Sequence, residues 1–389
     1  MIVRNGSGGL NAILVGLDVG ALGQAEDLDE FRELATSAGL VPVCQISGKR
    51  IKPDAATFAG AGKVQEIAEA VKAEAAQLVL FNHDISAAQE RNIEREVGVR
   101  VIDRTGLILE IFAKRAKSFE GKLQVELAQL ERLSTRLIRG WTHLERQRGG
   151  IGVRGGPGET QLEMDRRMLS DRIKSLKERL SRLKSQRGLQ RNARQRNRVF
   201  NISIVGYTNA GKSTLFNRLV RAKAYVADQL FATLDTTTRK IFLGDGQHAV
   251  VSDTVGFIRN LPHGLVAAFR ATLEETIHAD LLVHVVDAAN PRRDQQIEEV
   301  NAVLEEIGAD RIPQLMVWNK IDLVPDWSSA VERDEYGKLL AVKMSALDGN
   351  GAELLRAALL ELAQTGDSAM TPSSGMNSAT SALVPLAKI

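Results

Sequence analysis

The chain has 389 residues, of which 25% are charged and 44% are hydrophobic. This balance excludes a disordered chain, a collagen and a disulfide-rich scaffold, and the length predicts two or three domains. Cys44 is the only cysteine, so no internal disulfide can form and a reducing compartment, the cytoplasm, is expected. No apolar run reaches about 18 residues, so neither a membrane span nor a signal peptide is expected.

The net charge is only +3, but the charge is unevenly distributed along the chain. Residues 132–198 contain 19 Lys or Arg and 6 Asp or Glu, a surplus of +13, which leaves −10 on the remainder. A strongly basic segment on an acidic body favours a polyanionic partner such as nucleic acid. The alternative is a basic helix that is simply solvated.

The first 105 residues alternate short apolar runs with helical patterns. The apolar runs cover 12–19, 40–47, 77–82 and 99–103, and the helical patterns between them cover 27–39, 62–75 and 85–98. Strands that alternate with helices indicate a small parallel α/β domain. The sequence GAGK at 60–63 follows no clear strand, so it is interpreted as the start of a helix and not as a second nucleotide site.

Residues 106–198 predict a basic helical hairpin. Leucines line one face of a first helix that is expected to end near Arg139, and a second helix is expected to begin near Glu159. The seam residues are Leu123, Leu127, Leu130 and Leu137 on the first helix and Leu169, Ile173, Leu176, Leu180 and Leu183 on the second. The 4-3-4-3 spacing of the second set is typical of a coiled coil, and the two helices are expected to pair antiparallel around a loop at 140–160 rich in glycine and arginine.

Residues 199–365 again show an α/β pattern, with the expected strands FNISIVG, HAVVSD, LLVHVVD, PQLMVWN and LLAVKMS in a mostly parallel sheet. The segment 366–389 is rich in Ser, Thr and Ala without periodicity, and it is predicted to be a disordered tail. The fold class is therefore α/β, with two such domains joined by the hairpin.

The segment GYTNAGKS lies between the strand FNISIV and a helical pattern and matches the phosphate-binding loop G-x-x-x-x-G-K-[ST]. The glycines let backbone N–H groups face phosphate oxygens at the N-terminus of a helix. Lys212 is expected to reach the β- and γ-phosphates, and the Ser213 hydroxyl to bind Mg²⁺. The loop residues expected to contact the nucleotide are Gly206, Tyr207, Thr208, Asn209, Ala210, Gly211, Lys212, Ser213 and Thr214.

Two further motifs select guanine and sense the γ-phosphate. In HAVVSDTVG, Asp253 is expected to hold Mg²⁺ through water and the Gly256 N–H to meet the γ-phosphate. In WNKID, the Asp322 carboxylate can accept both N1–H and the exocyclic amine of guanine, which adenine does not offer. The other contacts expected here are Thr254, Val255, Asn319, Lys320 and Ile321, with Ser345, Ala346 and Leu347 near the guanine O6. The three motifs in order predict a GTPase domain; a metabolic kinase is disfavoured because no acceptor-substrate motif is present.

A switch segment is expected between the phosphate-binding loop and Asp253, where a threonine completes the Mg²⁺ shell. Thr233, Thr236, Thr237 and Thr238 all qualify by spacing, although at least two should only lead into the strand KIFLG. No catalytic residue can be assigned. Phe257 follows the D-x-x-G motif where Ras-like proteins carry a water-orienting Gln, so slow intrinsic turnover is expected.

GYTNAGKST, FATLD, DTVGFIRNLPH and WNKID together resemble the HflX family of translation-factor-class GTPases. The upstream segments FAGAGKVQEI, VLFNHDISAAQERNIER, RGWTHLERQRGGIG and GPGETQLEMDRR are similar to the family's N-terminal region, so the resemblance runs from about residue 10 to 365. It implies that Thr233 is the switch threonine and binds Mg²⁺, with Phe231, Ala232, Leu234 and Asp235 in the same GTP site. Family members commonly carry a further small domain after the GTPase core, where this sequence continues into the Ser/Thr-rich segment.

The resemblance also implies partners. The family binds the large ribosomal subunit and separates stalled or stress-arrested ribosomes, switched by GTP and GDP, and its Gly/Arg-rich loop points toward the peptidyl-transferase region. Arg139, Arg146, Arg148 and Arg154 are the expected contacts to ribosomal RNA, and the doubled Gly155-Gly156 could change the reach of this loop. The alternative function is a GTP-gated RNA-binding or chaperone-like protein that does not split ribosomes. A monomer is expected.

Asn209 occupies the loop position that binds K⁺ beside the transferring phosphate in potassium-activated relatives. The equally weighted alternative is a loop residue that braces its own backbone. K⁺ is therefore a second candidate cofactor beside Mg²⁺.

Overall fold

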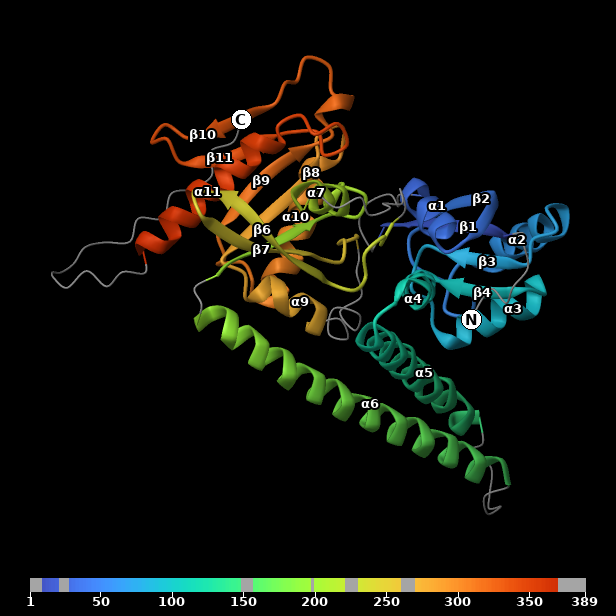
Figure 1. Ribbon diagram of the computed structural model, residues 1–389. Coiled ribbons are helices and arrows are strands. Elements are labelled where there is room, and N and C mark those ends of the chain that lie inside the picture. Colours follow the sequence, from blue (N-terminus) through green and yellow to red (C-terminus); the bar gives the residue numbers. More distant parts are fainter. Residues whose placement is uncertain are drawn as a thin grey trace, which may run out of the picture.

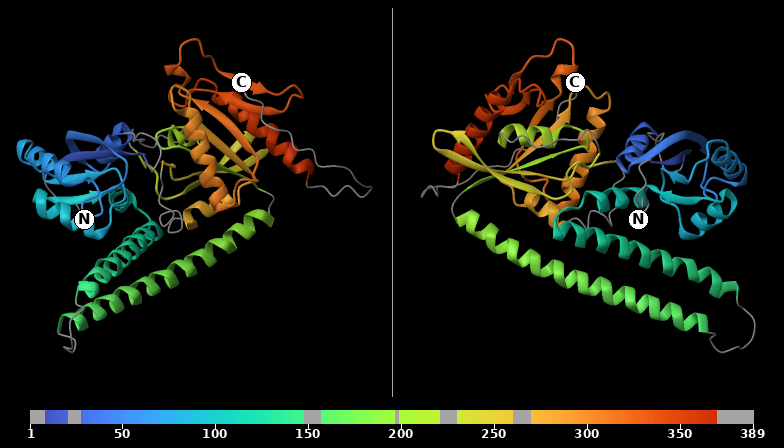
Figure 2. Two further views of the ribbon diagram at one scale, coloured as in Figure 1. Left: turned by 180° about the vertical axis from the view of Figure 1, so that it is seen from behind. Right: turned by 45° about the vertical axis from the view of Figure 1, so that its right-hand side comes forward.

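The computed structural model describes residues 9–20, 28–147, 157–196, 199–220, 230–259 and 270–369. Two α/β domains lie side by side, and a long pair of helices runs beneath both of them (Figures 1 and 2). The predicted fold class is confirmed, because each sheet, the hairpin and the phosphate-binding loop occur in the expected order.

The N-terminal domain contains four parallel strands in the order β2-β1-β3-β4. The strands are β1 (Leu10–Val19), β2 (Leu40–Arg50), β3 (Leu78–Phe81) and β4 (Arg100–Asp103). The helices are α1 (Leu28–Ser37), α2 (Ala61–Ala73), α3 (Ala87–Val97) and α4 (Arg104–Arg115). Alternate residues of β1 enter two different cores, one shared with α1 and α4 and the other with α2 and α3, as expected for a sheet covered on both faces.

The GAGK sequence begins helix α2, with Gly60 as its N-cap at φ 84°. Lys63 Nζ donates to the Ser47 carbonyl at 3.0 Å and pairs with Glu66 at 2.6 Å. The lysine is therefore engaged by the protein itself, in agreement with the interpretation as a helix start.

The hairpin consists of α5 (Phe119–Gln147) and α6 (Pro157–Arg196), which run antiparallel (Figure 1). Leu123, Leu127 and Leu176 are buried between them. Leu130, Ile173, Leu180 and Leu183 pack against these three at the edges of the seam. Ion pairs bridge the helices from Arg172 to Glu126 and from Lys177 to Glu131. The predicted coiled-coil seam is confirmed over these residues.

The predicted loop at 140–160 was too long. Helix α5 continues through 140–147 and α6 already begins at Pro157, which leaves 148–156 outside the described residues. Leu137, Trp141 and Leu144 continue the helical spacing, and proline suits the first position of a helix. Arg139 and Arg146 therefore belong to α5, although their side chains are not described; Arg148 and Arg154 lie outside the described residues.

The C-terminal domain contains a seven-stranded sheet in the order β10-β11-β9-β8-β5-β7-β6, parallel at its centre and antiparallel at both edges. The strands are β5 (Phe200–Gly206), β6 (Thr237–Gly244), β7 (Gln247–Asp253), β8 (Leu281–Asp287), β9 (Gln314–Asn319), β10 (Ala330–Arg333) and β11 (Leu339–Lys343). The helices are α7 (Lys212–Val220), α9 (Arg270–Ile277), α10 (Arg293–Ile307) and α11 (Ala352–Ala369), with a 3₁₀ turn at Ile321–Leu323. Only β10 was not expected, because this edge strand has four residues and no apolar run.

Helix α11 runs to Ala369, so residues 366–369 are helical and not part of a disordered tail. The apolar residues of this helix up to Ala363 pack against the second core of the sheet. Residues 370–389 lie outside the described part of the chain. Within the described residues, no helix combines the length and the hydropathy needed to cross a membrane.

One core continues from the N-terminal domain into the GTPase domain. Phe112 of α4 stacks edge to face on Phe231 with ring centroids 4.7 Å apart. The Tyr207 hydroxyl donates to Glu30 at 2.5 Å, and Arg104 donates to the Arg259 carbonyl at 3.0 Å. The N-terminal domain therefore packs directly on the segments that surround the nucleotide motifs.

Candidate nucleotide-binding site

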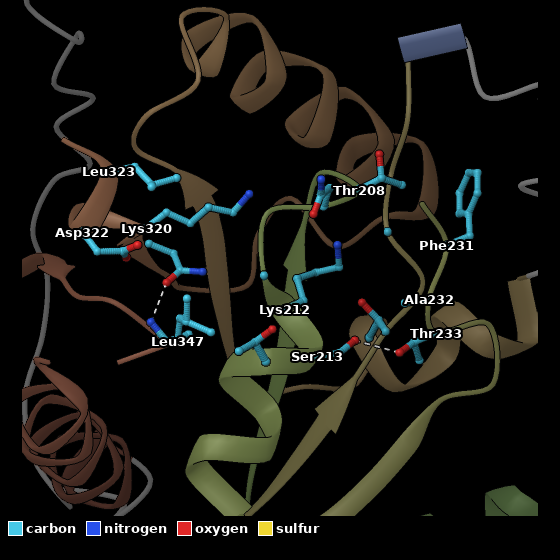
Figure 3. Close-up of a pocket in the computed structure, with 17 residues that line it drawn as sticks. Thr208, Lys212, Ser213, Phe231, Ala232, Thr233, Lys320, Asp322, Leu323 and Leu347 are labelled. Atoms are coloured by element: carbon cyan, nitrogen blue, oxygen red, sulfur yellow. Dashed lines mark hydrogen bonds between the residues drawn. The ribbon is translucent and has the colours of Figure 1, made fainter. Parts of the chain in front are cut away.

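A cavity of about 410 Å³ lies at the carboxyl ends of the central strands of the C-terminal sheet (Figure 3). Its lining residues come from the phosphate-binding loop, the switch segment and the loops after β7, β9 and β11. They are Thr208, Asn209, Gly211, Lys212, Ser213, Thr214, Phe231, Ala232, Thr233, Thr254, Gly256, Asn319, Lys320, Asp322, Leu323, Ala346 and Leu347. Segments more than 130 residues apart in the sequence therefore form one site.

The phosphate-binding loop turns sharply at a glycine. Gly211 has φ 92°, and a Cβ there would lie 2.2 Å from the Asn319 side-chain nitrogen, so only glycine fits. Lys212 begins α7, is buried, and donates from Nζ to the Tyr207 carbonyl at 2.6 Å. Burial lowers the pKa of Lys212 to about 8, although the nearby Asp253 carboxylate opposes this shift. A buried ammonium at the start of a helix is a site for phosphate.

Ser213, Thr233 and Asp253 meet beside this lysine. The Asp253 carboxylate accepts from the Ser213 hydroxyl at 2.7 Å and from the Thr233 hydroxyl at 2.8 Å, and the two hydroxyls are 2.8 Å apart. Burial raises the pKa of Asp253. Its other oxygen, Oδ1, is buried without a hydrogen-bond partner among the described residues. Two hydroxyls and a carboxylate are oxygen ligands of the kind that Mg²⁺ binds directly or through water, so this set fits the ion.

The competing switch threonines are placed differently. Thr238 lies on β6 and its hydroxyl is 3.2 Å from that of Ser252 on β7, while Thr237 begins β6. These two residues support a strand, as at least two of the four threonines were expected to do.

The opposite end of the cavity is built by the loops after β9 and β11. Asn319 is buried; it donates to the Ala210 carbonyl at 2.8 Å and accepts from the Ala346 N–H at 2.9 Å, so it ties three motifs together. Lys320 has φ 64°, and its ammonium lies 2.8 Å from Asp287. Asp322 is exposed beside it on the 3₁₀ turn (Figure 3).

Leu323 and Leu347 flank this end and are 63% and 71% exposed. Exposed leucines of this size are suited to pack on a flat aromatic base. Leu323 was not predicted from the sequence; its only signal is an apolar residue directly after the aspartate of N-K-x-D.

Comparison with known proteins agrees with this geometry. Three family models match consecutive parts of the chain: GTP-binding GTPase N-terminal over 25–113, GTP-binding GTPase Middle Region over 115–194, and 50S ribosome-binding GTPase over 201–320. The GTPase HflX of Escherichia coli is 58% identical over 86% of this chain and 79% of its own length. The chain belongs to the HflX GTPase family. The GTPase HflX of Magnetococcus marinus is 49% identical over 84% of this chain and 76% of its own length.

Membership of the HflX family identifies the chain as a GTPase with a P-loop domain, a fold that typically uses Mg²⁺ with its nucleotide. A solved structure supports the arrangement of the domains. The crystal structure of SsGBP in complex with GDP is 25% identical, covers 92% of this chain and 99% of that one, and has a TM-score of 0.51.

Several residues expected to contact the nucleotide do not line the cavity of this HflX-family GTPase. They are Gly206, Tyr207, Ala210, Leu234, Asp235, Asp253, Val255, Ile321 and Ser345. Most of them are buried, and Tyr207 and Asp235 bond residues of the other domains. The Tyr207 hydroxyl reaches Glu30, and the Asp235 carboxylate accepts from the N–H groups of Lys117 at 2.8 Å and Ser118 at 2.7 Å.

Asn209 and Phe257 complete the phosphate end. Asn209 is exposed at φ 60° and lines the cavity, and its side chain has no hydrogen bond to the described residues. Phe257 is buried, 1% exposed, within the core shared with the N-terminal domain. Its ring offers no hydrogen bond to an attacking water.

Proposed function

We propose that this GTPase binds the large ribosomal subunit and separates or remodels stalled ribosomes, with bound GTP or GDP setting its affinity. The observation that carries the proposal is the hairpin of α5 and α6, which runs as a long arm beneath both α/β domains (Figure 2). Arg166, Arg167, Arg179 and Arg182 are exposed on α6. A charged arm of this kind suits the phosphate backbone of folded RNA.

The match to the 50S ribosome-binding GTPase model supports a ribosomal partner. The proposed contacts are Arg139, Arg146, Arg148 and Arg154, which lie at or near the tip of the arm in the sequence. Asp235 supports a link to the nucleotide, because the same switch segment that carries Thr233 also contacts Lys117 and Ser118, which directly precede α5.

Sedimentation through sucrose gradients tests this function. Purified 70S ribosomes are incubated with the protein and a non-hydrolysable GTP analogue, with GDP, or with a Lys212→Ala variant as the control. The proposal requires the protein in the 50S fractions and a loss of 70S particles with the GTP analogue, and much less of both in the two other samples. Intact 70S particles in all samples, together with tight binding to free RNA, would instead favour an RNA chaperone.

At the nucleotide site we propose that Mg²⁺ is held by Ser213 and Thr233 directly and by Asp253 through water. The ion supplies charge stabilisation to the phosphates when it is bound. The Asn209 side chain lines the cavity and makes no hydrogen bond to the described residues, so it is available to K⁺. Slow turnover is expected because the buried Phe257 cannot orient water. GTPase rates in KCl and NaCl decide this point: equal rates would exclude a role for K⁺.

A further inference from the structure

The buried ring of Phe257 leaves the hydrolytic water without the hydrogen-bonding side chain that a Ras-like glutamine provides. The backbone groups of Phe257 are also already hydrogen-bonded within the protein. The N–H donates to the Gly206 carbonyl at 3.1 Å, and the carbonyl accepts from the Thr208 N–H at 2.7 Å. Another group at the γ-phosphate end must therefore position the water.

Thr208 lies close to Lys212 and Gly256, the two residues expected to contact the γ-phosphate. A Cβ built on Gly256 would lie 2.9 Å from Lys212 Nζ and also 2.9 Å from Thr208 Cγ2. Lys212 and the Gly256 N–H are the groups that reach the γ-phosphate in this motif set. Thr208 itself lines the cavity (Figure 3), and its methyl carbon is the side-chain atom that lies beside Gly256.

The Thr208 hydroxyl is buried and has no hydrogen-bond partner among the described residues. Neighbouring hydroxyls differ: Thr254 donates to the Ile204 carbonyl at 2.6 Å, and Thr233 bonds Ser213 and Asp253. An unpaired buried hydroxyl costs free energy, because folding removes its hydrogen bonds to water. Its partner is therefore expected in the nucleotide-bound state, which a rotation about the Cα–Cβ bond can reach.

We propose that the Thr208 hydroxyl positions the attacking water during GTP hydrolysis. The water oxygen forms a bond to the γ-phosphorus while the bond from this phosphorus to the β–γ bridging oxygen breaks, and GDP leaves with the electron pair. Both hydrogens of the water remain with the released phosphate, one of them after transfer to a phosphate oxygen. Thr208 keeps its own proton, accepts a hydrogen bond from the water and donates one to a γ-phosphate oxygen.

This proposal depends on GTP hydrolysis in this cavity and not on the ribosome. Two substitutions separate the hydroxyl from the shape of the side chain. Thr208→Val replaces the hydroxyl by a methyl group of similar size, and Thr208→Ser keeps the hydroxyl. Thr365→Val, at an exposed position of α11, is the matched control for the same chemical change.

Single-turnover GTP hydrolysis, GDP affinity and thermal unfolding are measured for all four proteins. Thr208→Val should slow hydrolysis by roughly 100- to 1,000-fold, the range for removal of one preorganised hydrogen-bond donor, while Thr208→Ser stays within about threefold of the parent protein. GDP affinity should change by less than about threefold, because GDP lacks the γ-phosphate. The melting temperature of Thr208→Val without nucleotide should not fall, since an unpaired hydroxyl is removed.

Hydrolysis by Thr208→Val within twofold of the parent would overturn the proposal. Equal slowing in the Val and Ser variants, or a loss of GDP binding in Thr208→Val, would also overturn it, because the side chain would then act through packing. A failure of the GTPase assignment looks different: the parent protein itself would then bind or hydrolyse no GTP.

Discussion

At the scale of single residues, the expected selection of guanine depends on a carboxylate that the structure leaves accessible. Asp322 is exposed on a short 3₁₀ turn whose preceding residue, Lys320, adopts φ 64°. Asn319 fixes the turn from behind through its bonds to Ala210 and Ala346. The carboxylate is thus held at the cavity with both acceptor oxygens available to a base that offers two donors.

Asp322→Asn should therefore weaken GDP binding by about 100-fold or more, because one acceptor becomes a donor opposite the guanine amine. The same variant should bind xanthosine diphosphate more tightly than the parent protein does, since xanthine carries a carbonyl where guanine carries the amine. Isothermal titration with both nucleotides measures this exchange. Asp326→Asn, at an exposed neighbouring position, is the control. Unchanged nucleotide preference in Asp322→Asn would contradict the role assigned to this residue.

The sequence located the phosphate-binding loop and N-K-x-D, because each motif is a short local segment, and residues of both line the cavity. Their contacts to a nucleotide stay predictions. It predicted neither the hydrogen bonds of Asp235 to residues 117 and 118 nor the position of Leu323 in the lining of the cavity. Asp235 contacts residues 117 and 118, and nothing in the switch segment itself indicates a partner so distant in the sequence.

At the scale of elements, Asp235 joins the switch segment to the start of α5. Ser118 caps this helix by accepting from the Gly121 N–H at 2.8 Å, and its hydroxyl in turn donates to Asp235 at 2.5 Å. A Cβ on Gly121 would lie 2.1 Å from Asp235 Oδ1, so the close approach requires glycine. A carboxylate at a helix N-terminus also stabilises the helix through its dipole.

Asp235→Ala should fray the first turn of α5, because two backbone N–H groups and the Ser118 hydroxyl lose their acceptor. The free energy of unfolding should fall by about 1–2 kcal/mol, as for removal of a helix cap. Hydrogen exchange of residues 117–121 should become faster. Asp310→Ala, at an exposed site away from the hairpin, should change neither quantity. Unaltered exchange in this turn would show that Asp235 does not stabilise it.

The seam of the hairpin gives a second prediction at this scale. Leu176 is fully buried between α5 and α6, so Leu176→Ala leaves a cavity that the two helices cannot fill. A decrease of about 2–4 kcal/mol in the free energy of unfolding is expected from urea titration. Ser181→Ala, exposed on the same helix, should be nearly neutral. A decrease below about 0.5 kcal/mol for Leu176→Ala would contradict the packing of the two helices.

The hairpin also shows how far periodicity can be followed in a sequence. The leucine spacing located both helices and their seam, because an a/d repeat is visible without knowledge of the fold. The first helix was predicted to end too early and the second to begin too late, because glycines such as Gly140 suggested a loop. A glycine costs about 1 kcal/mol within a helix, which a long helix tolerates.

At the scale of the whole molecule, the basic segment and the nucleotide motifs occupy different parts of the chain. The surplus of +13 lies within 132–198, whereas the nucleotide motifs lie in the acidic remainder. The shared core and the Tyr207–Glu30 bond join the N-terminal domain to the GTPase domain, and the hairpin connects the same two domains along the chain. Nucleotide and RNA would therefore bind to different parts of one connected molecule.

This separation predicts how binding to 50S subunits depends on salt. Affinity should fall linearly with salt on a double-logarithmic plot, because each neutralised phosphate releases counterions. Replacing the exposed Arg166, Arg167 and Arg179 together by Gln should reduce the magnitude of the slope by roughly 2, at about 0.7 for each phosphate that is no longer neutralised. A matched triple replacement of Arg239, Lys240 and Arg311, exposed on the GTPase domain, should leave the slope unchanged. Equal slopes for both triple variants and the parent protein would place the RNA-binding arginines outside α6.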